Sequence, residues 1–223
     1  MKITMVIPIY DDFESLEVLI TLIQETPDDH IFFLVVDNGS TDERVSKLLS
    51  NPRSNWRGIR SDTNLGFGGG ILFGVSKAET EYVGWMPGNL KIDPRDTPDF
   101  LNSASFSEKN FVKARRVSRS KSAHIKTIML GLAQSIFLRT AMFDAGGTPT
   151  ICSREFLLSL PNPPNDYAFE SYVLFKARKA KMKISRPSVV YTARKFGSSH
   201  WQKGLTSEIK LFISIIKKSK KWR

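Results

Sequence analysis

The sequence predicts an α/β protein whose mostly parallel sheet is flanked by helices. Two apolar runs rich in β-branched residues, at 3–9 and 31–37, are typical of strands buried on both faces. Between them, residues 13–24 place apolar side chains at mostly helical spacing. Strands that alternate with helices indicate a parallel sheet, and ligands of such sheets bind beyond the carboxyl ends of the strands.

The rest of the first half continues this alternation. We expect a short helix at 42–49 capped by Ser40 or Thr41, a weak strand at 57–60, a helix at 70–78 and a strand at 82–86. Polar or turn-forming residues follow three of the strands. Asp11, Asp37 and residues 87–89 are therefore expected at one edge of the sheet.

The second half is less regular, and no internal repeat or flexible linker interrupts it. We expect a strand running into a basic loop at 111–117, an amphipathic helix at 125–138, a turn at 146–149, a helix at 167–180, an edge-type strand at 183–191 and a final helix at 206–218. A chain of 223 residues suits one domain with a sizeable core.

Composition narrows the class of protein. A hydrophobic content of 41% excludes a disordered chain. The single cysteine, Cys152, forms no disulfide framework and points to a reducing compartment. No apolar run approaches the ~20 residues of a spanning helix, and the first residues lead directly into a strand rather than a signal peptide. We expect a cytoplasmic protein, either soluble or attached to the inner face of the membrane.

Charge is distributed unevenly along the chain. Residues 1–100 hold 9 basic and 16 acidic residues, a net charge of −7, whereas residues 101–223 hold 24 and 6, a net charge of +18. The second half should therefore face a phosphate-bearing acceptor, a membrane surface or nucleic acid, unless it is simply a solvated basic surface. No recognised motif supports nucleic acid as a partner.

Three segments of the first half, at 6–12, 35–42 and 64–70, together resemble family 2 glycosyltransferases with the Rossmann-like GT-A fold. Three weaker segments, at 114–116, 153–155 and 194–199, resemble the polyprenol-phosphate branch of that family, the relatives of dolichol-phosphate mannosyltransferase. The resemblance implies a glycosyltransferase domain at 1–203, with a nucleotide-binding half at 1–100 and an acceptor half at 101–203. An amphipathic, basic C-terminal helix at 204–223 completes the chain.

The resemblance implies transfer of a hexose, with inversion, from a UDP- or GDP-sugar to a polyprenyl-phosphate or glycan acceptor. Asp37 would accept hydrogen bonds from the base, beside a wall formed by Pro8 and Tyr10. Asp11 or Asp12 would bind a ribose hydroxyl. The nucleotide-sugar site would comprise Pro8, Tyr10, Asp11, Asp12, Asp37, Asn64, Gly66, Gly88 and Asn89.

Each of these segments also has a structural interpretation. The polar run that begins at Asp37 could simply cap a helix, because Asp, Asn and Ser favour turns. The glycines at 66–70 fit neither a P-loop nor a GxGxxG fingerprint. They could form a tight turn that contacts no ligand.

Residues 87–89 (Pro-Gly-Asn) stand where similar enzymes carry two carboxylates that hold a divalent cation. Mg²⁺ or Mn²⁺ remains possible as a cofactor, but Pro and Asn are poor ligands for these ions and no metal-ligand set is evident. We hypothesise that Lys91, Arg115 and Arg116 supply the positive charge instead. A solvated Lys91 is the alternative, and Asp93 could still reach a metal.

The acceptor side is less well defined. The resemblance implies that Arg194 and Ser198 hold an acceptor phosphate, whose oxygen needs no strong base. A hydroxyl acceptor would need a carboxylate base, for which Glu170 is a candidate together with Asp144 and Asp166. The chain departs from its relatives at Tyr172 and at 148–150.

The final helix combines an apolar face with a basic end and Trp222, a pattern typical of a membrane interface or of packing onto the domain. Two alternatives to lipid glycosylation remain open. One is transfer to a sugar hydroxyl in polysaccharide biosynthesis. The other is a non-catalytic pseudo-glycosyltransferase that only binds a sugar nucleotide, suggested by residues 87–89.

Overall fold

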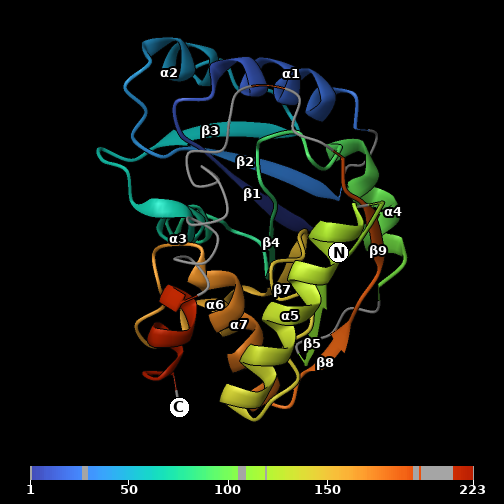
Figure 1. Ribbon diagram of the computed structural model, residues 1–223. Helices are drawn as coiled ribbons and strands as arrows, with labels where there is room; N and C mark the ends of the chain where they lie inside the picture. Colours follow the sequence, from blue (N-terminus) through green and yellow to red (C-terminus); the bar gives the residue numbers. More distant parts are fainter. Residues whose placement is uncertain are drawn as a thin grey trace.

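The computed structural model describes residues 2–26, 30–104, 109–118, 120–192, 196 and 213–222. A seven-stranded sheet forms its centre, in the order β3-β2-β1-β4-β7-β5-β8 (Figure 1). The strands are β1 (Ile3–Ile9), β2 (Ile31–Asp37), β3 (Trp56–Arg60), β4 (Tyr82–Trp85), β5 (Asn110–Lys113), β7 (Thr150–Ser153) and β8 (Lys183–Ser185). The first four are mutually parallel, β7 runs antiparallel to β4 and β5, and β5 is parallel to β8.

Helices cover both faces of this sheet. They are α1 (Phe13–Gln24), α2 (Glu43–Leu49), α3 (Gly66–Ser76), α4 (Thr97–Asn102), α5 (Lys121–Leu138), α6 (Arg154–Leu158) and α7 (Ala168–Lys179), with a 3-10 turn at Pro94–Asp96. One buried cluster joins α1, α2 and α4 to alternate residues of β1, and a second joins α3, α6 and α7 to the opposite face. The fold class predicted from the sequence is therefore confirmed (Figure 1).

Two of the expected strands are each divided between the central sheet and a small second one. The first divides into β5 and β6 (Arg115–Val117), the other into β8 and β9 (Ser188–Val190), and β6 pairs with β9 in parallel. The second division falls at Pro187, which lacks an amide hydrogen but whose carbonyl accepts a hydrogen bond from Arg115 N at 2.8 Å.

Strand β7 was missed by the sequence analysis. It has only four residues, all buried, and it follows directly on the expected turn. Cys152 lies within it, and burial raises the pKa of its thiol, which agrees with a packing role. The cap of α2 also differs from the prediction. Asp42, rather than Ser40 or Thr41, caps this helix and accepts a hydrogen bond from Arg44 N at 2.9 Å.

The described part of the C-terminal segment is helical at 213–219 and packs onto the domain. Ile215 and Trp222 are buried, and the Trp222 ring lies edge-on to Tyr172 with 5.5 Å between centroids. Lys176 Nζ donates to the carbonyl oxygen of Trp222 at 3.1 Å. Trp222 is thus a packing residue and does not present a membrane anchor. Among the described residues, no helix is both long and apolar enough to cross a membrane.

Candidate active site

The three N-terminal motifs meet at the carboxyl edge of the parallel strands, and Asn38 joins two of them. Its Nδ2 donates to Asn64 Oδ1 at 3.3 Å and to the Gly66 carbonyl at 3.1 Å, and its Oδ1 accepts from Leu65 N at 3.2 Å. Gly66 adopts φ +77°, and a Cβ there would collide with the carbonyl oxygen of Asn165. The sequence analysis placed both segments here but did not single out Asn38.

Asp11 fixes the turn that leads into α2. Its Oδ1 accepts hydrogen bonds from Thr41 N at 2.7 Å and Asp42 N at 3.2 Å, while its own amide donates to Ser40 Oγ at 3.0 Å. The residue adopts φ +45°, a left-handed conformation that Asp tolerates better than most side chains. A structural role for Asp11 is therefore present alongside any contact with ribose. Asp12 precedes α1 and makes no side-chain cap bond to that helix.

Asp37 is fully buried at the end of β2, in register with Ile9 of β1. Its Oδ1 accepts from Ser40 N at 2.8 Å, and its Oδ2 accepts from Arg60 Nη1 at 2.5 Å. A carboxylate has about four acceptor positions, so lone pairs remain on both oxygens, but the side chain is only 1% exposed and a base could reach it only if Arg60 moved aside. The sequence analysis missed Arg60, whose partner lies across the β2–β3 pair.

Pro8 and Tyr10 lie in β1 and in the turn after it, next to the strand that ends in Asp37. Pro8 lies opposite Val36 in the β1–β2 register, and both Pro8 and Tyr10 are partly exposed. Their positions are compatible with the predicted wall beside a base. The predicted nucleotide residues of the first two motifs therefore converge at one edge of the sheet.

Residues 87–89 form a turn that is built for packing. Gly88 is buried, and a Cβ there would collide with the side chain of Ile9. Asn89 Oδ1 accepts from Lys91 N at 3.3 Å, and Leu90 adopts φ +58° between them. Neither Gly88 nor Asn89 offers a charged oxygen ligand.

The turn at residues 87–89 offers no charged ligand to a divalent cation. Asp93, the nearby acid, pairs with Arg95 at 2.7 Å. Within the described ranges, no three His, Cys, Asp or Glu side chains are grouped so that they could hold a metal ion. In nucleotide sites a divalent cation is commonly held by one or two carboxylates together with substrate phosphates, and residues 87–89 supply no such carboxylate.

Lys91 and Arg116 lie beside the same aromatic ring, although one follows β4 and the other lies in β6. Lys91 Nζ is 6.0 Å and Arg116 Cζ 5.5 Å from the centroid of the Tyr191 ring. The carbonyl of Lys91 accepts from Thr192 N at 2.9 Å, which ties the turn after β4 to the segment after β9. Arg115 is exposed and donates to Ser188 Oγ at 2.9 Å. Lys91 and Arg116 are thus brought to one aromatic ring, whereas Arg115, the preceding residue in β6, projects to the other face of that strand.

Arg116 has an anionic partner that the sequence analysis did not assign to it. Its Nε donates to Asp144 Oδ1 at 2.8 Å, its amide donates to Asp144 Oδ2 at 3.1 Å, and Nη2 completes the pair. Burial alone would raise the pKa of Asp144, but the charge and hydrogen bonds of Arg116 hold this pKa below its ordinary value. Part of the Arg116 charge is therefore already neutralised.

Glu170 lies in the core and is not open to an acceptor. Its Oε1 accepts from Trp85 Nε1 at 2.7 Å, and its Oε2 pairs with Lys113 Nζ at 2.6 Å. Burial lowers the pKa of Lys113 while the charge of Glu170 opposes that shift, and Lys113 also donates to Thr150 Oγ1 at 3.0 Å. This arrangement does not support the prediction of Glu170 as an accessible base.

The other two candidate bases are paired as well. Asp144 is held by Arg116, and Asp166 forms an ion pair with Lys218. The predicted acceptor-phosphate residues, Arg194 and Ser198, lie outside the described residues.

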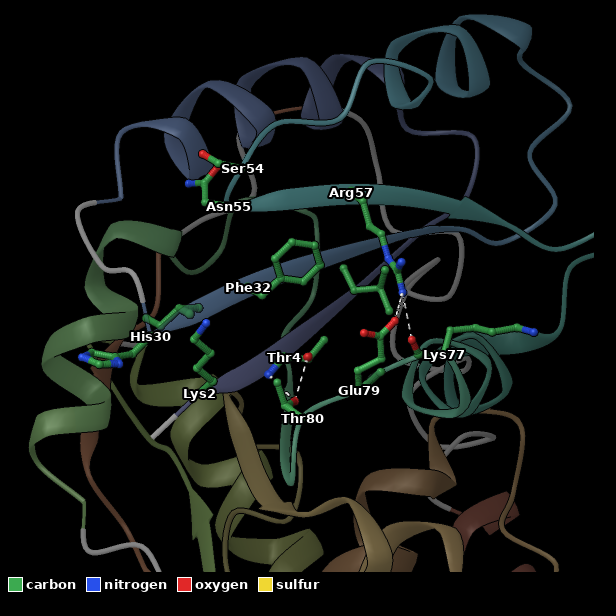
Figure 2. Close-up of a pocket in the computed structure, with 13 residues that line it drawn as sticks. Lys2, Thr4, His30, Phe32, Ser54, Asn55, Arg57, Lys77, Glu79 and Thr80 are labelled. Atoms are coloured by element: carbon green, nitrogen blue, oxygen red, sulfur yellow. Dashed lines mark hydrogen bonds and ion pairs between the residues drawn. The ribbon is translucent and has the colours of Figure 1, made fainter.

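A cavity of about 300 Å³ lies elsewhere, at the amino ends of the parallel strands (Figure 2). Lys2, His30, Arg57 and Lys77 line it together with Glu79, which pairs with Arg57 at 3.5 Å. No residue predicted for the nucleotide-sugar or acceptor site lines this cavity. It lies at the edge of the sheet opposite to Asp37 and residues 87–89.

The comparisons with known proteins identify the family of this chain. Residues 4–159 match the family described as Glycosyl transferase family 2. The match spans more than half of the chain, which therefore belongs to this family and is a glycosyltransferase.

Solved structures show the same GT-A fold. Glucosyl-3-phosphoglycerate synthase from Mycobacterium tuberculosis, in complex with Mn²⁺, UDP and glucosyl-3-phosphoglycerate, superposes with a TM-score of 0.70 at 17% identity, over 97% of this chain and 76% of that chain. A complex of the same synthase with Mn²⁺, UDP-glucose and phosphoglyceric acid superposes with a TM-score of 0.70 at 17% identity, over 97% of this chain and 80% of that chain. A structure described as that of a mycobacterial protein superposes with a TM-score of 0.72 at 18% identity, over 97% of this chain and 75% of that chain. These identities establish the fold and assign no branch within the family.

Proposed function

We propose that this glycosyltransferase transfers a hexose, with inversion, from a UDP- or GDP-sugar to a phosphate oxygen of a polyprenyl-phosphate-like acceptor. Basic side chains would take the place of a metal ion at the diphosphate. The observation that carries the proposal is the pairing of all three candidate bases, Glu170, Asp144 and Asp166, with cations. An acceptor that is already an anion needs no base to remove its proton.

The donor site is supported by the convergence of the first two motifs. Asp37 has lone pairs left for the N–H groups of uracil or guanine once Arg60 moves aside, and Pro8 and Tyr10 lie in and just after the neighbouring strand β1. The synthase with the same fold was crystallised with UDP and with UDP-glucose. We therefore favour a UDP-hexose as the donor.

The departing diphosphate needs positive charge as its bond to the sugar breaks. Lys91 belongs to the turn that stands where similar enzymes carry metal-binding carboxylates. Lys91 and Arg116 lie beside the same Tyr191 ring, and Arg115 precedes Arg116 in β6. An ammonium is a compact charge that can be presented to phosphate oxygens. In this proposal Lys91 and Arg115 contact the diphosphate, and Arg116 positions that region through Asp144.

The acceptor side rests on charge and chemistry. A phosphate monoester carries about −1.5 to −2 charge at pH 7, so one of its oxygens can attack the anomeric carbon directly. That carbon forms a bond to the acceptor oxygen while its bond to the diphosphate breaks on the opposite face. The charge of +18 on residues 101–223 suits such an acceptor, with Arg194 and Ser198 proposed as its ligands. Residues 1–203 would form the catalytic domain, attached peripherally to the cytoplasmic face of a membrane.

A second candidate function is the binding of a sugar nucleotide without transfer. The absence of acidic ligands at residues 87–89 favours it, because the metal would normally stabilise the leaving group. Both functions require nucleotide binding, but only the first includes transfer of the sugar.

The test is a transfer assay with radiolabelled UDP-glucose and GDP-mannose. Acceptors would be a short-chain prenyl phosphate, phosphoglyceric acid and a neutral oligosaccharide. We expect label on the prenyl phosphate and none on the oligosaccharide or on the hydroxyl of phosphoglyceric acid. Label on the oligosaccharide or on that hydroxyl, with none on the prenyl phosphate, would contradict the acceptor proposal. Nucleotide binding without transfer to any acceptor would favour the second candidate.

A further inference from the structure

Helix α5 packs onto the domain through a face that contains small and polar residues. Its buried positions are Gly131, Gln134 and Leu138, all on one side of the helix. Gln134 Nε2 donates to Ser171 Oγ of α7 at 2.9 Å, and Gly131 lies close to Phe143. Small and polar residues thus make much of the contact with the domain.

The opposite side of α5 presents large apolar side chains to solvent. The exposed residues follow helical spacing and are Ile125, Ile128, Met129, Leu132 and Ile136. Met129 is 63% and Ile136 78% exposed, and the nearby Phe143 is also exposed. Residues three, four and seven apart share a helix face, so these side chains form one continuous stripe. Single exposed apolar residues need no explanation, but a contiguous stripe marks a contact surface.

Charge around the stripe indicates what it contacts. Lys121 and Arg139 stand at its two ends, Lys126 lies at its side, and all three are exposed. No Asp or Glu occurs from residue 109 to residue 143. Of the basic residues that the structure describes in this stretch, Lys109, Arg115, Lys121, Lys126 and Arg139 are exposed, whereas Lys113 and Arg116 are paired with Glu170 and Asp144. A second copy of this chain would bring like charges together across the stripe, whereas an anionic lipid surface would attract them.

We propose that the outward face of α5 docks onto an anionic membrane surface. The apolar stripe would enter the boundary between headgroups and acyl chains, with Lys121, Lys126 and Arg139 among the headgroups. The inference deepens the proposed function and rests on it for its purpose, since a polyprenyl-phosphate acceptor is held in a membrane. β6, with Arg115, precedes α5 closely in the chain. In the C-terminal segment Ile215 and Trp222 are buried against the domain, and residues 204–212 of the predicted helix lie outside the described residues.

The experiment is flotation of the full chain with phosphatidylcholine vesicles, with and without phosphatidylglycerol. The test variant is Met129→Glu/Ile136→Glu, and the matched control is Leu158→Glu, which alters an exposed leucine on α6. We expect wild type and control to float with the anionic vesicles only, and the test variant to partition at least about tenfold more weakly. Because the altered residues are exposed, all three proteins should share one melting temperature.

Three results would overturn the proposal. The first is equal flotation of the test variant and the wild type. The second is no flotation of the wild type. The third is a wild-type dimer in size-exclusion chromatography that the test variant dissociates, which would assign the stripe to a second copy. Flotation uses neither donor nor acceptor, so it stands apart from the proposed function. Transfer to the soluble short-chain prenyl phosphate should be the same in all three proteins, and its absence throughout would count against the proposed function alone.

Discussion

Lys113 Nζ lies 2.6 Å from Glu170 Oε2, with the two side chains 0% and 7% exposed. Lys113 ends β5 and Glu170 lies in the first turn of α7, so the pair joins the sheet to that helix. Removing two charges from water carries a large desolvation penalty, which only their close mutual attraction can offset. The pair therefore fixes Glu170 as part of the core and withholds its carboxylate from chemistry at the neighbouring strand ends.

Removing one partner of this pair should destabilise the protein strongly. We expect Lys113→Met to lower the free energy of unfolding by about 3–5 kcal/mol, because it leaves the Glu170 charge buried and unpaired. The double variant Lys113→Met/Glu170→Gln should recover part of that loss. Urea unfolding measures both. Arg95→Met, which breaks exposed pairs with Glu25 and Asp93, is the control and should have little effect. A Lys113→Met protein as stable as wild type would refute the assignment.

Asp37→Asn should weaken nucleotide binding. A hydrogen bond to a charged group contributes about 1.5–3 kcal/mol, so we expect the Kd for UDP to rise by about 10- to 150-fold in isothermal titration calorimetry. Asp42→Asn is the matched control, because Asp42 belongs to the same motif but caps α2. Equal Kd values for the two variants would remove Asp37 from the nucleotide site.

The Arg116–Asp144 pair should make stability depend on pH in the acid range. The pKa of Asp144 is held below its ordinary value of 3.8, so the unfolded chain binds its proton first as pH falls. The stabilisation is fully present above pH 3.8 and is lost as pH falls through the lower pKa of the folded state. Urea unfolding at a series of pH values should show a shallower acid slope for Asp144→Asn than for wild type. Parallel slopes would contradict the pair.

Lys91→Met should impair the chemical step. Removing one group that stabilises developing charge commonly costs about 10²–10³ in kcat, and Lys91 is proposed for that role at the diphosphate. Steady-state kinetics of hexose transfer provide the test, with Lys47→Met as the control on the exposed surface of α2. An unchanged kcat for Lys91→Met would identify Lys91 as a solvated loop residue.

The sequence predicted the local part of this structure well. Apolar runs and helical spacing identified β1, α1 and β2 at the bounds that the structure shows. The order of the three N-terminal motifs identified the edge of the sheet where they meet. Such features depend on neighbouring residues and on the general rules for parallel sheets.

The parts that were missed depend on contacts between distant residues. Lys113 and Glu170 are 57 positions apart, and no local sequence pattern in either segment predicts that they pair. Arg60 and Asp37 meet only because β3 lies beside β2. The periodicity of α5 indicated an amphipathic helix but could not show that the face with Gly131, Gln134 and Leu138, rather than the large apolar face, packs onto the domain. That orientation depends on what α7 offers as a partner.

The central claim is that positive side chains replace the metal ion of similar enzymes, and metal removal tests it most directly. Hexose transfer should be measured in excess EDTA, with and without added Mn²⁺, for wild type and for Lys91→Met/Arg115→Met. The account predicts that wild-type transfer persists unchanged in EDTA and that the double variant loses it. Transfer that EDTA abolishes and Mn²⁺ restores in the wild type would contradict the claim.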